Sequence, residues 1–313
     1  MTDPVAPESL TWSTEQRNAA STAIDRLTTA ALVDVILAQD ATVIAAVQAV
    51  SAQVAAAADL MIAAIAAGGV VHYVGAGTSG RLGVLDAVEL FPTYDAGPEL
   101  VRAHLAGGDE AMMTAVEGAE DDEAAGAQVA TEARDHDVVV GIAASGRTPY
   151  VTGALRAARQ RGLATVLVSM NPTAPAAAYA DVAVLPDTGP EVVTGSTRMK
   201  AGTATKLVLN AMSTATMVRL GRTYENLMID MRVTNAKLAA RSVRMLSDAT
   251  GADAATAAQV RAAAGDTRTA LVALLADVDA DAAKAALAAQ PRDPNRAGDP
   301  SGVRAAVASL RVD

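Results

Sequence analysis

The chain contains 313 residues, of which 51% are apolar, so it is long enough and apolar enough to bury a large core. Its 25 basic and 35 acidic residues give a formal net charge of −10, and 2% of its residues are aromatic. Negative charge disfavours binding to nucleic acids and anionic membranes, and few rings are present for base stacking. Cysteine is absent, and the three histidines lack the spacing of metal ligands. We therefore expect no nucleic-acid partner, no membrane partner and no metal.

The N-terminal part of the sequence predicts helices and no targeting segment. Apolar side chains recur at helical spacing over residues 24–37, and an Ala-rich stretch runs from 42 to 67 before two glycines. The first residues lack the basic and apolar regions of a signal peptide, and polar side chains interrupt the Ala-rich stretch. We expect a cytoplasmic protein that opens with a helical extension.

Strand, loop and helix alternate through the middle of the chain. A short apolar strand at 70–74 leads into a Gly-rich loop at 75–81 and then into a helix that ends before Pro92. The pattern recurs from residue 137, where a Val-rich strand leads into the loop 141–148. Because further strand candidates alternate with helical segments, we expect an α/β fold in which helices flank both faces of a parallel sheet.

The C-terminal part of the sequence predicts a small helical unit and a tail. Residues 251–290 are dominated by alanine and fall into three short pieces, each opened by an Asp that can cap a helix. Proline and glycine then interrupt residues 291–313, which we expect to form a flexible tail. Residues 1–250 are expected to form the main domain with its helical extension. The capping residues are Asp253, Asp266 and Asp279.

The two Gly-rich loops have the composition of an anion site. A strand that feeds a glycine turn and then a helix presents unpaired backbone N–H groups and the positive end of the helix dipole. Hydroxyl groups add donors, and glycines let an anion approach the backbone. We expect both loops to converge on one phosphate monoester. The residues concerned are Gly77, Thr78, Ser79, Ser145, Gly146 and Thr148.

Other interpretations of these segments remain open from the residues alone. The first loop also satisfies the G-x-G-x-x-G pattern of dinucleotide sites, but Glu99 precedes the next strand candidate instead of following it, which favours the phosphate monoester. Arg147 could contact the phosphate or lie on the surface. Ser196 belongs to a third hydroxyl-rich segment and could contact substrate or form part of a helix-capping turn.

Two acidic positions could carry acid–base chemistry. Glu89 lies among Val, Leu and Phe residues, surroundings that raise the pKa of a carboxyl group and make it a proton donor near neutral pH. A solvated Glu on a helix surface fits the same pattern. Glu120 belongs to an acidic run at 117–123, most of which we expect to be solvated. Spacing alone does not select which residues of that run face a site.

The segments that contain these residues closely resemble the N-acetylmuramic acid 6-phosphate etherases, a family of the sugar isomerase (SIS) fold. Residues 141–150, with the sequence Gly-Ile-Ala-Ala-Ser-Gly-Arg-Thr-Pro-Tyr, are the most specific piece. The resemblance implies a flavodoxin-like SIS domain and extends to a small ubiquitin-associated-like unit at 251–290. The matching segments are 73–83, 115–121, 138–151 and 191–210, with looser matches at 226–230 and 234–238.

The resemblance also implies a reaction. This family converts N-acetylmuramic acid 6-phosphate and water into N-acetylglucosamine 6-phosphate and D-lactate, by elimination and then water addition, in the salvage of cell-wall sugars and without a cofactor. Its two essential glutamates fall on Glu89 and Glu120, and its phosphate contacts fall on Thr78, Ser79, Ser145 and Thr148. Glu89 is the candidate donor to the lactyl oxygen and Glu120 the candidate second acid or base, and the resemblance leaves open which of the two removes the proton. The resemblance further implies a homodimer.

Two rival functions share the predicted fold. A regulator that senses sugar phosphates, similar to the glucokinase regulatory protein, would keep the phosphate loops and need no acid pair. An aldose–ketose isomerase would share the proton abstraction but would leave a lactyl ether unused. The presence of both Glu89 and Glu120 favours the etherase.

Overall fold

The computed structural model describes residues 12–311, which divide into two compact units. The first unit comprises the chain up to Ala87 together with Pro98–Ser213, and the second comprises Val88–Gly97 and the chain from Thr214 onward. The division therefore differs from the expected boundary at residue 250. The second unit also takes in residues 88–97 and 214–250, which include the C-terminal ends of two long helices.

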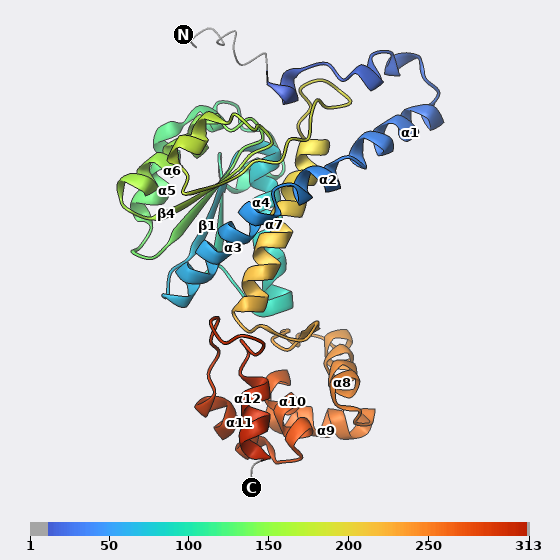
Figure 1. Ribbon diagram of the computed structural model, residues 1–313, viewed down its shortest axis with the longest axis vertical. Coiled ribbons are helices and arrows are strands. Elements are labelled where there is room, and N and C mark those ends of the chain that lie inside the picture. The colour runs from blue at the N-terminus through green and yellow to red at the C-terminus, as the bar shows by residue number, and fades with distance from the viewer. Residues whose placement is uncertain (1–11, 312–313) are drawn as a thin grey trace. The chain divides into compact units, whose positions relative to one another are not determined.

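A five-stranded parallel sheet in the order β2-β1-β3-β4-β5 forms the centre of the first unit (Figure 1). Val71 of β1 pairs with Val101 of β2 and with Val138 of β3, so the two Gly-rich loops follow neighbouring strands. The predicted α/β fold with a parallel sheet is confirmed. The strands are β1 (Val71–Gly75), β2 (Val101–Leu105), β3 (Val138–Ile142), β4 (Ala164–Val168) and β5 (Val182–Val184).

Helices cover both faces of this sheet (Figure 1). Gly141 of β3 meets the side chains of α6, whereas Gly83 of α4 packs against Tyr73 and Ile142 on the opposite face. Both faces are therefore buried, which is why the strands are rich in valine and lack polar alternation. The helices are α1 (Thr29–Asp40), α2 (Val43–Gln48), α3 (Ser51–Ala66), α4 (Gly77–Tyr94), α5 (Glu123–Glu132), α6 (Pro149–Gln160) and α7 (Lys200–Arg219).

Two helix boundaries differ from those expected from the sequence. The helix expected at 24–37 begins at Thr29, where the Thr28 hydroxyl accepts a hydrogen bond from an N–H of the first turn. Helix α4 continues through Pro92, because proline removes only one backbone hydrogen bond in a last turn that the Thr93 hydroxyl and the N–H of Asp95 still close.

Helix α1 has no buried residue, and its residues are exposed or partly exposed, although it is apolar. The stretch Thr29–Gln48, which contains α1 and α2, has a mean hydropathy of 1.8, and 6% of it is buried. By length and composition alone it could cross a membrane. A span at 29–48 was not expected from the sequence, which indicated only the Ala-rich stretch 42–67 as a candidate, one that polar side chains interrupt.

The second unit is helical apart from a two-stranded antiparallel hairpin, β6 (Thr223–Tyr224) with β7 (Leu227–Met228). Each of the three expected Asp caps accepts a backbone N–H of its helix, which confirms that prediction. The expected flexible tail instead forms α12, whose Val303 and Val307 are buried in the core beside α10. The helices are α8 (Ala236–Thr250), α9 (Ala254–Ala264), α10 (Thr267–Ala276), α11 (Ala280–Ala289) and α12 (Val303–Leu310).

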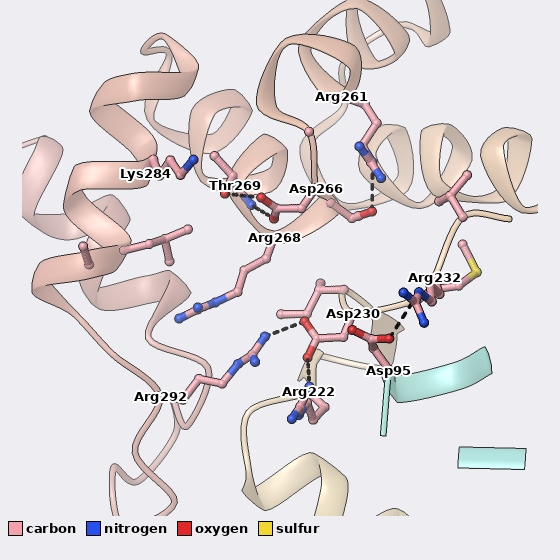
Figure 2. A pocket seen from close by; sticks show the side chains of 17 residues that line it. Asp95, Arg222, Asp230, Arg232, Arg261, Asp266, Arg268, Thr269, Lys284 and Arg292 are labelled. Atoms are coloured by element: carbon pink, nitrogen blue, oxygen red, sulfur yellow. Dashed lines mark hydrogen bonds and ion pairs between the residues drawn. The ribbon is translucent and has the colours of Figure 1, made fainter. Parts of the chain in front are cut away.

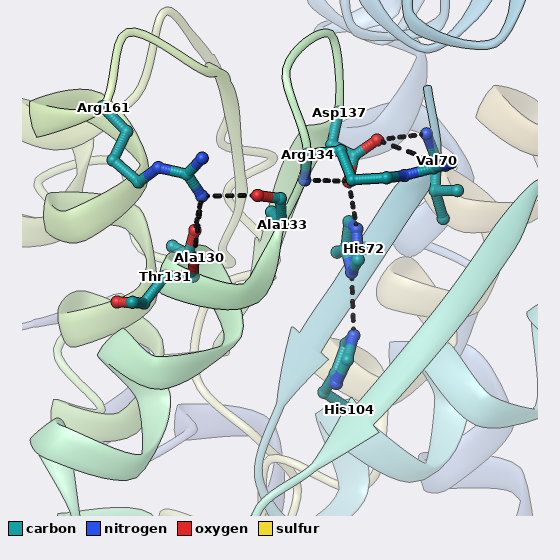
Figure 3. A network of polar contacts seen from close by, with 9 residues as sticks. All are labelled: Val70, His72, His104, Ala130, Thr131, Ala133, Arg134, Asp137 and Arg161. Atoms are coloured by element: carbon teal, nitrogen blue, oxygen red, sulfur yellow. Dashed lines mark hydrogen bonds and ion pairs between the residues drawn. The ribbon is translucent and has the colours of Figure 1, made fainter. Parts of the chain in front are cut away.

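A largely buried polar chain links the first three strands (Figure 3). Asp137 accepts the backbone N–H groups of Val70 and Arg134 at 2.7 and 2.8 Å, and His72 Nε2 at 3.0 Å. His72 Nδ1 lies 2.9 Å from His104 Nε2. Because the carboxylate only accepts, His72 carries its proton on Nε2, and its Nδ1 accepts the Nε2–H of His104. Burial lowers the pKa of His104 to about 4 and also lowers that of His72.

This chain makes stability depend on pH. The histidines have lower pKa values in the folded protein than the ordinary 6.5, so the unfolded chain binds more protons as the pH falls below 6.5. The resulting stability is complete above pH 6.5 and is lost as the pH falls toward 4. We expect His104→Gln, which keeps an N–H donor toward His72, to remove about 1–2 kcal/mol of the loss between pH 7 and pH 5. Urea unfolding at both pH values measures this, with the exposed His136→Gln as the unchanged control.

Candidate functional site

A cavity of about 480 Å³ in the first unit is formed by the loops that follow β1 and β3. A short 3-10 helix at Ala119–Asp121 and the loop before α7 complete its wall. Ligand sites in parallel sheets of this kind lie at the carboxyl ends of adjacent strands. The lining residues are Glu15, Ala76, Gly77, Thr78, Ser79, Glu120, Asp121, Ala143, Ala144, Ser145, Arg147, Thr148, Pro149, Gly195 and Thr197.

The first loop delivers the N-terminus of α4 to the cavity. Helix α4 begins at Gly77, whose φ of 52° turns the chain, and Thr78 and Ser79 follow in its first turn. These positions combine free backbone N–H groups, hydroxyl donors and the positive end of a long helix dipole. An anion is the group that this corner of the cavity attracts.

Two glycines of the G-x-G-x-x-G pattern have a packing role. A Cβ on Gly80 would lie 2.5 Å from the carbonyl oxygen of Gly75, and a Cβ on Gly75 would lie 2.8 Å from the Cα of Gly80. The pattern therefore reflects the close contact between β1 and α4. Glu99 precedes β2, as the sequence indicated, so it does not take the position of the ribose-binding acid in dinucleotide sites.

The second loop is held rigidly and carries two hydroxyl groups. Gly146 has a φ of 66°, and Asn171 donates its side-chain N–H to the carbonyl of Ser145 at 3.0 Å. Pro149 then begins α6. Ser145 and Thr148 both line the cavity, so the structure brings the hydroxyl groups of both predicted loops to one site.

Of the two remaining expected contacts, Arg147 lines the cavity and Ser196 does not. Arg147 lines the cavity, and its guanidinium lies 4.9 Å from the ring centre of Trp12. Arg81, the arginine that follows the last glycine of the first loop, donates to the carbonyls of Ala111 and Met112. Ser196 does not line the cavity, whereas both of its neighbours do.

The structure separates the members of the acidic run. Glu120 and Asp121 line the cavity, whereas the Asp122 carboxylate accepts the N–H of Ala125 at the start of α5. Glu123 pairs with Arg156 at 2.6 Å. Within the run, Glu120 and Asp121 are therefore the two carboxylates at the cavity.

Glu89 lies near the end of α4, in the second unit, and its side chain is exposed. Three of the apolar residues around it are exposed as well: 61% for Val88, 52% for Leu85 and 39% for Phe91, whereas Leu90 is buried. The sequence predicted a carboxyl group among apolar side chains. The three exposed side chains are present, but in the single chain they face solvent.

Sequence reasoning missed the residue that fixes the loop before α7. Glu191 is fully buried and accepts the backbone N–H groups of Lys200 and Ala201 at 2.9 Å each. It thereby caps α7 and holds the segment that brings Gly195 and Thr197 to the cavity. No local pattern marks Glu191, because its partners follow nine and ten residues later.

The chain is similar to several known proteins. The model of the glucokinase regulatory protein N-terminal SIS domain matches residues 53–159, and the SIS domain model matches residues 112–215. An N-acetylmuramic acid 6-phosphate etherase of Symbiobacterium thermophilum is 53% identical over 85% of this chain and 89% of its own length. One of Mycolicibacterium smegmatis is 51% identical over 86% and 92%. A solved phosphoheptose isomerase of Francisella tularensis has a TM-score of 0.48 at 17% identity, over 60% of this chain and all of that one.

The second loop should be intolerant of a side chain at Gly146. A Cβ there would lie 2.2 Å from the Cβ of Ala174, in addition to the cost of a positive φ. We expect Gly146→Ala to lower the free energy of unfolding by about 3 kcal/mol, measured by urea denaturation. Gly162→Ala is the matched control, because Gly162 also has a positive φ but open space around it, and it should cost about 1 kcal/mol. Equal losses for the two variants would contradict the tight contact.

Proposed function

The chain belongs to the N-acetylmuramic acid 6-phosphate etherase family, and we propose that it cleaves the D-lactyl ether of N-acetylmuramic acid 6-phosphate. The products are N-acetylglucosamine 6-phosphate and D-lactate. The observation that carries this proposal is the identity of about half of all residues to etherases over nearly their whole length. The convergence of two hydroxyl-bearing loops on one cavity supports a phosphate monoester as the substrate's anchoring group.

The phosphate is held by neutral donors. The proposed donors are the backbone N–H groups at the start of α4 and the hydroxyls of Thr78, Ser79, Ser145 and Thr148, whose residues line the same cavity. Arg147 is the cation in the lining. An anion in an acidic protein needs such local, oriented donors, because the overall charge of −10 repels it.

The chemistry requires an acid and a base on one edge of the opened sugar. Removal of the proton beside the aldehyde leaves an electron pair that forms a double bond as the lactyl oxygen departs from the neighbouring carbon. That oxygen leaves as an alcohol only if a proton is delivered to it, and water then adds to the double bond. We assign Glu89 as the donor to the lactyl oxygen and Glu120, at the cavity wall, as the second acid or base. Proton transfers activate both the breaking of the lactyl carbon–oxygen bond and the addition of water, and nothing is oxidised or reduced overall, so the proposed reaction requires no cofactor.

A second copy of the chain is part of the proposal. The exposed apolar face of α4 formed by Leu85, Val88 and Phe91 carries Glu89, and burying that face against another copy would give Glu89 the apolar surroundings of a proton donor. The exposed, apolar α1 is a second surface for the same association. This homodimer would act in the cytoplasm, which the absence of cysteine allows.

The proposed activity is tested by incubating the purified protein with N-acetylmuramic acid 6-phosphate and measuring D-lactate. We expect Glu89→Gln and Glu120→Gln each to lower kcat at least about 100-fold, because amides cannot exchange the proton. Substrate binding, measured by calorimetry, should change little, because neither side chain belongs to the phosphate loops. Glu117→Gln, in the same acidic run but outside the cavity lining, is the matched control and should retain activity.

The same assay decides between the etherase and a sensor of sugar phosphates. The observation that favours a sensor is the match of residues 53–159 to the SIS model of the glucokinase regulatory protein. A folded sample that binds the substrate but releases no D-lactate would support the sensor and contradict the etherase.

The proposed homodimer is tested through the apolar face of α4. We expect Leu85→Glu to convert a dimer into a monomer, because it places a charge where the partner would bury an apolar side chain. Mass is measured by size-exclusion chromatography with light scattering. Ala285→Glu, at an exposed position on α11, is the control and should leave the mass unchanged. A monomeric wild-type protein would contradict the proposal.

A further inference from the structure

The second unit contains a cavity of its own, with a volume of about 610 Å³ (Figure 2). Its walls are the chain that follows β7, the corner between α9 and α10, one side of α11 and the segment after α11. None of its lining residues belongs to the site already described, and none carries an aromatic ring.

The cavity is strongly cationic although the chain as a whole is acidic. Six basic side chains line it, against three carboxylates. The excess of positive charge is opposite in sign to the net charge of −10. The basic residues are Arg222, Arg232, Arg261, Arg268, Lys284 and Arg292.

The three carboxylates are already engaged (Figure 2). Asp230 lies between Arg222, at 3.3 Å, and Arg292, and it pairs with both. Asp266 uses both oxygens to hold the N–H and hydroxyl of Thr269 at the start of α10. The third carboxylate, Asp95, pairs with Arg232 at 3.6 Å. The acids therefore neutralise one part of the cavity and leave another part positive.

Arg261, Arg268 and Lys284 are the cations left over. Within residues 12–311 none of the three has a carboxylate at ion-pair distance; Arg261 donates to a hydroxyl at the start of α10, and Arg268 donates only to the carbonyl of Ser301. The Nε atoms of Arg268 and Arg292 are buried in the described structure without a hydrogen-bond partner. Burial, with repulsion from Arg292, lowers the pKa of Arg268 to about 10. Buried guanidinium donors with no acceptor are costly, and an anion that accepts their N–H groups would reduce that cost.

We propose that this cavity binds a phosphate group, either as inorganic phosphate or as the phosphate of a small monoester. A dianion compensates the excess charge, and its oxygens accept the paired N–H groups of guanidinium more fully than a single carboxylate does. The volume exceeds that of phosphate alone and accommodates a phosphorylated sugar. The absence of rings from the lining argues against a nucleotide base. The site is independent of the proposed etherase activity.

The test is a calorimetric titration of the full chain with sodium phosphate at ionic strength held constant by NaCl. A Ser145→Ala, Thr148→Ala background first weakens the phosphate loops of the other unit. In that background we expect one saturable site, and Arg268→Gln with Lys284→Gln should weaken phosphate binding at least about tenfold. Arg241→Gln is the matched control, because Arg241 is exposed on α8 outside the cavity, and it should leave binding unchanged.

Hydrogen exchange of the wild-type chain supplies an independent measurement that needs no variant. We expect phosphate to slow amide exchange in residues 261–292. Protection confined to the loops at 76–80 and 145–152, or unchanged binding in the Arg268 and Lys284 variant, would overturn the proposal.

Two further ligands distinguish the source of the phosphate and the class of the anion. Glucose 6-phosphate that binds more tightly than inorganic phosphate identifies a monoester site, and equal affinity identifies a site for free phosphate; either result supports the proposal. Succinate that binds as tightly as phosphate would overturn the assignment to phosphate. Because D-lactate release is measured separately, failure here leaves the etherase proposal standing.

Discussion

The parallel pairing of β1 with β3 is the constraint on which the first site depends. Register places Gly75 beside Ile142, so the two loops leave the sheet at the same edge and their donors face one cavity. The strands themselves are buried valines that could accompany many functions. The groups that can bind a ligand lie in the loops after the strands, because backbone N–H groups and hydroxyls are free to donate hydrogen bonds there.

Close packing explains why these loops are glycine-rich at positions that never touch a ligand. Gly75 and Gly80 let β1 and α4 approach, and a Cβ on Gly126 of α5 would lie 1.8 Å from the carbonyl oxygen of Tyr150 in α6. The short distance between helices and sheet fixes the direction of the helix N-termini. The glycines of a motif can therefore be required by the scaffold while its hydroxyls are required by the ligand.

Local patterns predicted the local features of this fold. The runs of valine predicted the strands. The three Asp residues of the Ala-rich region predicted where helices begin, because an Asp cap binds backbone N–H groups within three residues of itself. Nothing local marks Glu191 as a buried cap, or joins His72, His104 and Asp137 into one chain, because their partners are brought together only by the sheet. Helix α12 was missed for a similar reason. Its few apolar residues are stabilised by the core of the second unit and not by their own sequence.

The two proposed phosphate sites would hold the same kind of group with different donors. Neutral N–H and hydroxyl donors in the first cavity are solvated when no ligand is bound, so an empty site costs little and a phosphorylated product can leave. Guanidinium groups in the second cavity repel one another when no anion is present, and two of their buried nitrogens then lack an acceptor. A ligand that removes this repulsion binds the folded state alone, and its binding free energy adds to the stability of the second unit. Neutral donors therefore suit a catalytic site that must release its product. Unpaired arginines suit a site in which a bound anion stays in place and stabilises the folded unit.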